Sequence, residues 1–178
     1  PAAISVSLLE PGSLGTEVLN HVDHIKDVRC LKISGKMNDD DWAKINMMTN
    51  LQSLDLSDAI VTKIPDYQFM KTDEKWQFLH KIELPNILEI IGRGAFEKSH
   101  VETLTFPSTL KEIGSFAFYY SKITEAILPD NMTNIGESAF EKSGLNSIDI
   151  PDGVTSIGNH AFYNCNNMTS ITIPATVT

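Results

Sequence analysis

The sequence predicts one α/β solenoid, with a parallel β-sheet on one face, short helical turns or 3₁₀ segments on the other, and an N-terminal cap. Evenly spaced prolines and a strand-like apolar pattern ahead of each proline lead to this prediction. The prolines lie 22, 22, 22 and 23 residues apart, at Pro85, Pro107, Pro129, Pro151 and Pro174. A chain of 178 residues, 42% of them hydrophobic, is long enough to bury a core without disulfide or metal crosslinks.

The apolar residues ahead of each proline predict short strands. They stand six, three and one positions before it, as Leu145, Ile148 and Ile150 do before Pro151. The same spacing begins at residue 28 and predicts seven strands. One strand per 22 or so residues leaves no room for a hairpin, so each return is a crossover and the strands are parallel. The spacing L-x-x-L-x-L is the strand signature of leucine-rich repeats.

The segment after each proline repeats as well. Ile-Gly follows six and seven residues after the first four prolines, and Ala-Phe follows ten and eleven residues after them. Burying one Phe is worth about 1.5–3 kcal/mol, so stacking explains why the column recurs. The glycine column fits either a positive φ or a close approach between coils. Gly-x-x-Ala-Phe is too short for more than about one turn, so 3₁₀ or a single helical turn is expected.

These columns resemble a known family. The unit L-x-x-I-x-[IL]-P-x-x-[LV]-x-x-I-G-x-x-A-F-x-x-[SC], clear in residues 145–165, is similar to the BspA-type leucine-rich repeat of bacterial surface proteins. The resemblance covers roughly residues 28–178. It implies a secreted or cell-surface solenoid that binds other macromolecules, with adhesion as the usual role. The chain begins at Pro1 without a signal segment, so we expect that any signal peptide was removed.

The first 27 residues do not repeat. An alternating segment, residues 4–8, predicts a strand, and apolar residues at helical spacing follow in residues 14–25. We predict that residues 1–27 form a cap over the first coil and that residues 28–178 form one continuous solenoid whose last repeat is incomplete. A second short helix is expected to start near Asp40 or Asp41 and to bury Trp42 and Ile45.

Charge argues against some partners. The chain has 14 Lys and Arg against 23 Asp and Glu, a formal net charge of −9. Nucleic acids and anionic membranes need clustered Lys and Arg, and the sequence shows no such cluster. No apolar run reaches the ~18 residues of a membrane-spanning helix. We therefore expect no nucleic-acid partner and no membrane span.

No metal or cofactor is expected. His21, Asp23 and His24 are placed on the cap helix but lack the further ligands of a zinc site, so a solvated helix face is predicted. The Asn38–Asp41 run lacks the Gly and distal Glu of a calcium loop, and helix capping explains it better. Cys30 and Cys165 lie five coil steps apart, about 24 Å, and are predicted to be separate thiols.

Catalytic motifs give no positive signal. The sequence contains no nucleophile elbow, P-loop, dinucleotide fingerprint or zincin spacing. His80, His100 and His160 fall on different repeat columns, so the repeat does not bring them together. We expect a protein that is not an enzyme.

Binding is expected on the strand face, where outward residues differ from coil to coil. Ile127 is apolar among polar neighbours in its column. The residues expected to bind are Lys81, Glu83, Thr103, Thr105, Glu125, Ile127, Ser147 and Asp149. The expected partner is a protein or glycan; the alternative hypothesis is a rigid spacer or assembly unit in a longer surface protein.

Other aromatic residues are given structural roles. Trp76 and Phe78 are predicted to fill the gap left by a longer second coil, since large apolar residues are mostly buried. Tyr119, Tyr120 and Tyr163 flank the phenylalanine column and are expected on the rim of the convex side.

Overall fold

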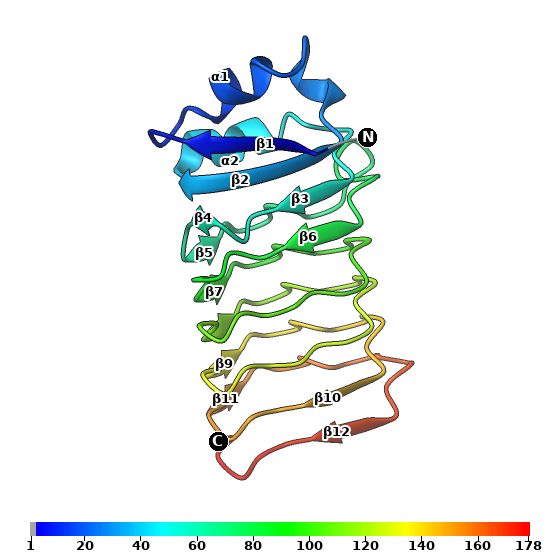
Figure 1. Cartoon of the computed structure of the whole chain (residues 1–178). Coiled ribbons are helices and arrows are strands. Elements are labelled where there is room, and N and C mark those ends of the chain that lie inside the picture. The colour runs from blue at the N-terminus through cyan, green and yellow to red at the C-terminus, as the bar shows by residue number, and fades with distance from the viewer. Residues whose placement is uncertain (1–2) are drawn as a thin grey trace.

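The computed structural model describes residues 3–178, and in it the chain winds as a solenoid of stacked coils (Figure 1). Every strand pairing is parallel, as the repeat predicts. The strand face carries β1 (Ile4–Leu8), β2 (Cys30–Lys36), β3 (Ser53–Asp55), β6 (Lys81–Glu83), β10 (Ser147–Asp149) and β12 (Ser170–Thr172). Inward-facing apolar residues of the strands up to β10, such as Leu31, Leu54 and Ile148, are buried in the core, whereas Ile171 of β12 is exposed.

This sheet is interrupted between β6 and β10. Residues 101–106 and 123–128, both predicted strands, contribute only the bridge between Thr103 and Glu125. Ala126 takes the inward position that Leu or Ile occupies in every other coil. Alanine supplies less of the packing that holds a strand in place, but the coil of residues 101–106 is equally irregular and has Leu104 at this position. The strand face is therefore two sheets separated by two less regular coils.

A second parallel sheet forms where the sequence pattern did not predict one. It follows the Ile-Gly column, and its members are β5 (Lys63–Ile64), β7 (Ile90–Ile91), β8 (Glu112–Ile113), β9 (Asn134–Ile135) and β11 (Ser156–Ile157). A further short strand, β4 (Ala59–Ile60), pairs with β2. The glycine column is explained by a close approach between neighbouring coils. A Cβ on Gly114 would lie 2.9 Å from the Arg93 backbone nitrogen of the preceding coil.

The segment around each stacked phenylalanine forms successive turns and not the expected 3₁₀ helix. Alternate amides close turns, as Ala95 N–H does to the Gly92 carbonyl at 3.3 Å. The amides between them cross to the next coil: Phe96 N–H donates to the Ala117 carbonyl at 2.7 Å. A helix would use all of these amides internally, so the neighbouring coil competes for half of them.

The phenylalanines stack along the solenoid axis as predicted. Ring centroids of Phe96, Phe118, Phe140 and Phe162 are 5.2, 5.1 and 5.6 Å apart, and the planes differ by at most 6°. Trp76 is buried with its indole 5.4 Å from the Phe69 ring, so it fills the longer coil as expected. The same expectation for Phe78 is wrong. Its side chain is 54% exposed because the single indole already occupies the space.

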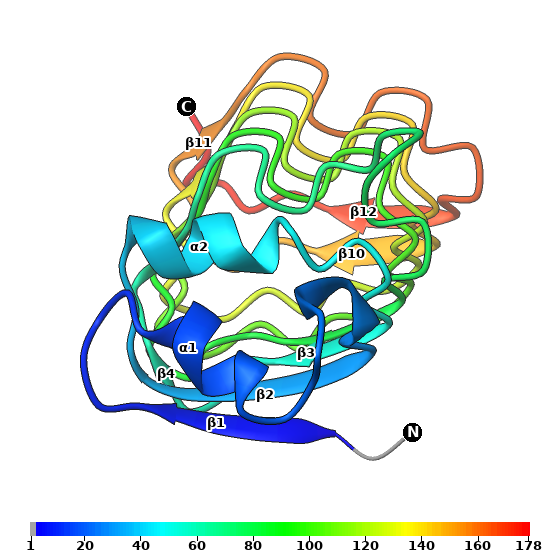
Figure 2. The same ribbon diagram turned by 90° about the horizontal axis from the view of Figure 1, so that it is seen from above.

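The helices of the chain lie at its N-terminal end. Figure 2 shows α1 (Leu14–Leu19), the 3₁₀ turn η1 (Ile25–Asp27) and α2 (Asp39–Ile45) lying across the end of the solenoid. β1 pairs with β2 over five residues and continues the sheet. Leu14 and Val18 of α1 are buried. A cap limited to residues 1–27 remains a prediction.

The N-cap of α2 is Asn38, one residue before the helix and earlier than predicted. Its side-chain oxygen accepts from the amides of Asp40 at 3.0 Å and Asp41 at 3.3 Å. Asp41 instead completes a capping box by accepting from the Asn38 amide at 3.0 Å. Trp42 and Ile45 are buried, as predicted.

Candidate binding surface

The eight residues proposed for binding all point out of the solenoid. Glu83 is half-buried and the other seven are exposed, whereas their neighbours Ile82, Leu104 and Ile148 are buried. This alternation follows from the period of two along an extended chain. The predicted orientation is confirmed, while a role in binding stays a prediction.

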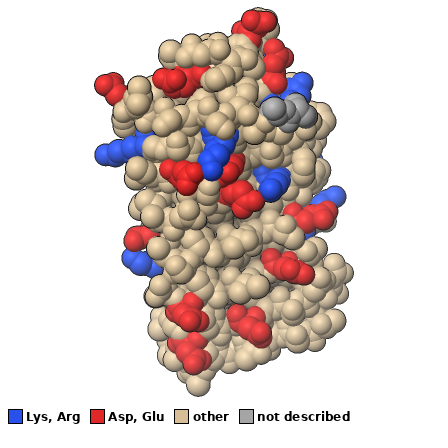
Figure 3. All heavy atoms as spheres, viewed as in Figure 1, with Lys and Arg blue, Asp and Glu red and all other residues tan. Residues whose placement is uncertain are grey.

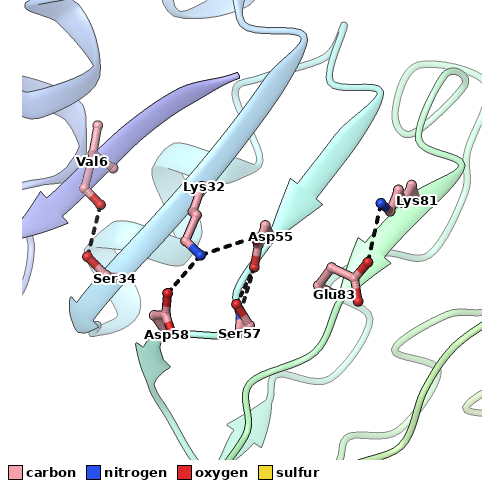
Figure 4. Close-up of polar contacts among 8 residues, drawn as sticks. All are labelled: Val6, Lys32, Ser34, Asp55, Ser57, Asp58, Lys81 and Glu83. Atoms are coloured by element: carbon pink, nitrogen blue, oxygen red, sulfur yellow. Dashed lines mark hydrogen bonds and ion pairs between the residues drawn. The ribbon is translucent and has the colours of Figure 1, made fainter. Parts of the chain in front are cut away.

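The end of this surface nearest the N-terminus is an ion cluster (Figure 4). Lys32 Nζ lies 2.7 Å from Asp58 Oδ2 and 3.4 Å from Asp55 Oδ2. Beside it, Lys81 Nζ lies 3.3 Å from Glu83 Oε1. Lys32, Asp55, Lys81 and Glu83 line a depression of about 430 Å³. Their charges are paired within the protein, which leaves less attraction for a ligand.

The cluster changes two pKa values. The hydrogen bond from Lys32 to Asp58 raises the pKa of the lysine above its usual value, against a smaller effect of desolvation. Desolvation alone would raise the pKa of Asp55. Hydrogen bonds from the Ser57 hydroxyl at 2.6 Å and the Ser57 amide at 2.9 Å, with the Lys32 charge, outweigh it and lower that pKa.

The opposite end of the surface is acidic and apolar. Ala126 lies in the lining of a hollow of about 330 Å³, beside Ile127, whose side chain is 84% exposed. Glu125 and Asp149 line the same hollow and form no ion pair with any residue of the described chain. Over these last coils, Figure 3 shows only acidic charged side chains.

Between the two ends, the surface is neutral. Thr103 and Thr105 are exposed and carry no charge. The fold therefore aligns all eight predicted residues on one side but divides them into a charge-paired end and an acidic, apolar end. Only the second has both an exposed apolar group and unpaired charges.

Sequence reasoning missed part of this surface. Ser5 of β1 and Ser57 and Asp58 after β3 belong to it or to its ion cluster. The alternation of residues 4–8 was a signal for Ser5, since a strand placed beside β2 turns that side chain outward. Asp58 lies in a turn outside the repeat columns, where the sequence offers no periodic signal.

The other candidate sites separate. Helix α1 ends at Leu19, and His21 and His24 follow it. The prediction that they lie on the cap helix is therefore wrong. Cys30 and Cys165 are both free thiols, and Cys165 Sγ donates to the Phe140 carbonyl at 3.0 Å as a packed core group. Within residues 3–178, no cluster of three His, Cys, Asp or Glu side chains has a geometry suited to a metal ion.

Membrane insertion is not supported by any helix of residues 3–178. Both α-helices are short, and neither has the length and apolar character needed to span a bilayer.

The repeat matches a known family model. The description is "BspA type Leucine rich repeat region", and six copies match over residues 62–178. The chain belongs to this family. The match covers the coils with the Pro, Ile-Gly and Ala-Phe columns, so the family and the packing pattern coincide. A comparison with curated proteins found no match.

Solved structures of bacterial leucine-rich-repeat proteins are similar to this member of the BspA-type family. The Treponema pallidum leucine-rich-repeat protein TpLRR aligns with a TM-score of 0.62 at 22% identity, over 72% of this chain and 62% of its own. A leucine-rich cell surface protein from Faecalibacterium prausnitzii aligns with a TM-score of 0.57 at 25% identity, over 82% of this chain and 38% of its own. The pneumococcal vaccine antigen PcpA aligns with a TM-score of 0.56 at 21% identity, over 85% of this chain and 48% of its own. The chain thus spans less than two thirds of each of these proteins.

Proposed function

We propose that this BspA-type solenoid is a non-enzymatic, extracellular protein-interaction or adhesion module of a bacterial surface protein. The family supports an interaction role, and one similar structure is described as a cell surface protein. The stacked coils support it physically, because each coil holds its outward side chains at a regular distance from those of the next coil.

The acidic, apolar end of the strand face is the proposed contact region. The main support is the exposure of Ile127, whose side chain is 84% exposed beside the hollow at Ala126. The unpaired carboxylates of Glu125 and Asp149 flank it. An apolar side chain at the centre and charges at the rim are typical of protein interfaces. The fitting partner is a protein that presents an apolar side chain next to Lys or Arg.

Selection from a displayed random-peptide library tests this proposal. Peptides that combine Lys or Arg with an apolar residue should be enriched on the wild-type protein. They should lose about tenfold or more in affinity for Glu125→Lys/Asp149→Lys, because attraction becomes repulsion. The matched control, Glu10→Lys/Asp23→Lys, makes the same charge change at the far end and should bind normally.

Equal binding of the selected peptides to both double variants would remove the strand face as the contact region. Failure to enrich any basic, apolar peptide over a carrier protein would count against an interaction role for this surface.

A rigid spacer within a longer surface protein is the second candidate. It is favoured by the unbroken phenylalanine stack and by the second sheet, which continues from β5 to β11 without interruption. Small-angle X-ray scattering should then fit a single rigid shape in solution. A spread of bent conformers would contradict the spacer, whatever the peptide selection shows.

A further inference from the structure

A row of basic and tyrosine side chains runs along the turns behind the phenylalanine stack. Its members lie two residues after each stacked phenylalanine: Lys71, Lys98, Tyr120, Lys142 and Asn164. The Lys98 amide donates to the Tyr119 carbonyl at 2.7 Å, and the Tyr120 amide donates to the Glu141 carbonyl at 2.9 Å. These bonds hold successive side chains about one coil, roughly 5 Å, apart. We call this set the lysine row.

Packing does not explain the residue types in the lysine row. Lys98, Tyr120 and Lys142 have φ of 57, 55 and 56°, in the left-handed region that favours Gly and Asn. Tyr120 and Lys98 are also exposed, so neither contributes to the core. Long basic and aromatic side chains at such positions indicate a role outside the fold itself.

A hollow beside the row has the size of a small-ligand site. It measures about 440 Å³ and is lined by Lys71, Lys98, His100, Tyr119, Tyr120 and Lys122. A second hollow of about 690 Å³ adjoins it and shares Tyr120 and Lys122. Both volumes lie in the range of ligand pockets.

The first hollow is electropositive. Desolvation, followed by the positive charges of Lys71 and Lys122, lowers the pKa of His100 despite a backbone hydrogen bond involving Gln77. Neither lysine forms an ion pair with another residue of the described chain. Their ammonium groups are therefore available to an anion.

The remaining lysines are only partly compensated. Lys98 Nζ lies 3.7 Å from Glu97, and Lys142 Nζ lies 3.4 Å from Glu141 and donates to Tyr119 Oη at 3.2 Å. The expectation that basic residues do not cluster is thus wrong at this face. The lysines are 20 or more residues apart in the chain, and the coils stack them.

We propose that the lysine row and its hollow bind an acidic oligosaccharide, a sugar chain carrying carboxylate or sulfate groups. Lys71, Lys98 and Lys122 would hold the anionic groups by charge-assisted hydrogen bonds. The ring of Tyr120, 58% exposed, offers an apolar face against which a sugar ring packs. A nucleic acid fits less well, because single strands stack successive bases on several aromatic side chains, and within residues 3–178 Tyr120 is the only exposed ring that lines this hollow.

Calorimetric titration with three hexasaccharides tests the proposal: sulfated heparin hexasaccharide, hexagalacturonate, and neutral cellohexaose. One or both acidic sugars should bind saturably with salt-sensitive affinity, and the neutral sugar should not. Comparing the two acidic sugars shows whether sulfate or carboxylate is preferred. Lys98→Gln/Lys122→Gln should weaken binding by roughly 100-fold and Tyr120→Ala by roughly tenfold.

Two control variants make the result specific. Lys111→Gln removes an exposed lysine paired with Glu89 elsewhere, and Glu125→Lys/Asp149→Lys alters the strand face; both should leave the affinity unchanged. Binding that survives loss of Lys98, Lys122 and Tyr120, or an equal loss in Lys111→Gln, would overturn the proposal. So would absence of saturable binding by either acidic sugar, or tighter binding of a single-stranded DNA oligonucleotide. The peptide selection tests the strand face and the sugar titration tests the lysine row. A negative result in one experiment therefore does not count against the other proposal.

Discussion

Asp41 is a carboxylate with no exposed surface, and it joins the start of α1 to the start of α2. It accepts from the amides of Gly12 at 2.7 Å, Leu14 at 3.0 Å and Asn38 at 3.0 Å. Two of these donors stand at the start of α1 and one precedes α2. A single side chain therefore fixes how the two helices meet at the end of the solenoid.

Replacing this carboxylate should destabilise the protein. We expect Asp41→Asn to lower the free energy of unfolding by about 3 kcal/mol, because an amide cannot accept from all three donors and leaves buried groups unpaired. Urea denaturation measures the change. Asp39→Asn, in the same helical turn but exposed, should stay within about 0.5 kcal/mol; similar losses in both variants would contradict a special role for Asp41.

Asp55 should make stability depend on acid. Its pKa is lower in the folded protein than the ordinary 3.8, so its contribution is full above pH 3.8 and is lost as pH falls below that value. Asp55→Asn should therefore reduce the loss of stability between pH 5 and pH 2.5. Urea midpoints across that range provide the measurement. An equal loss of stability in the wild-type protein and in Asp55→Asn would show that Asp55 does not contribute to the acid dependence.

The two sheets differ in regularity although both follow the same repeat. The second sheet crosses five coils with glycine next to each of its last four strands, and it pairs without a break. The strand-face sheet opens over residues 101–106 and 123–128, two coils that share only the bridge between Thr103 and Glu125. Two sheets built from the same repeat therefore differ in continuity.

Hydrogen exchange should reveal this difference. The amides of Thr105 and Ile127 have no backbone partner among the described residues, so they should exchange rapidly. The amides of Gly114 and Gly136, which donate to Ile91 and Ile113 at 2.8 Å, should be protected. NMR-detected exchange resolves them individually. Equal protection at all four positions would show that the strand-face ladder is closed in solution.

The molecule as a whole is held by contacts between neighbouring coils. In such a fold, damage spreads mainly to adjacent repeats. Phe140→Ala should cost about 3–5 kcal/mol and lower exchange protection in the coils around residue 140 first, while α2 stays protected. Phe78→Ala, at an exposed position, serves as the control and should change little. Simultaneous loss of protection in α2 would indicate one fully cooperative unit instead.

The repeat columns were enough to predict the solenoid, because Pro85, Phe96 and their counterparts report packing that recurs every coil. The second sheet was not predicted, since a two-residue strand such as Ile90–Ile91 has no alternation to detect. Outward orientation of Ile127 followed from the same period of two. The lysine row has a fixed place in the repeat, two residues after each stacked phenylalanine, but its hollow also needs His100 and Lys122, which only the stacking of the coils brings beside Tyr120.

The left-handed backbone of Lys98, Tyr120, Lys142 and Asn164 recurs once per coil, so the lysine row can be extended. One residue in every 22 or so adds the next side chain of the row. The backbone hydrogen bonds between coils set the position of that residue, whatever its side chain is. Duplicating one coil would lengthen the row by a single charge or ring at the existing spacing. A protein built this way could match ligands of different lengths through changes in copy number, with no new binding geometry to be invented.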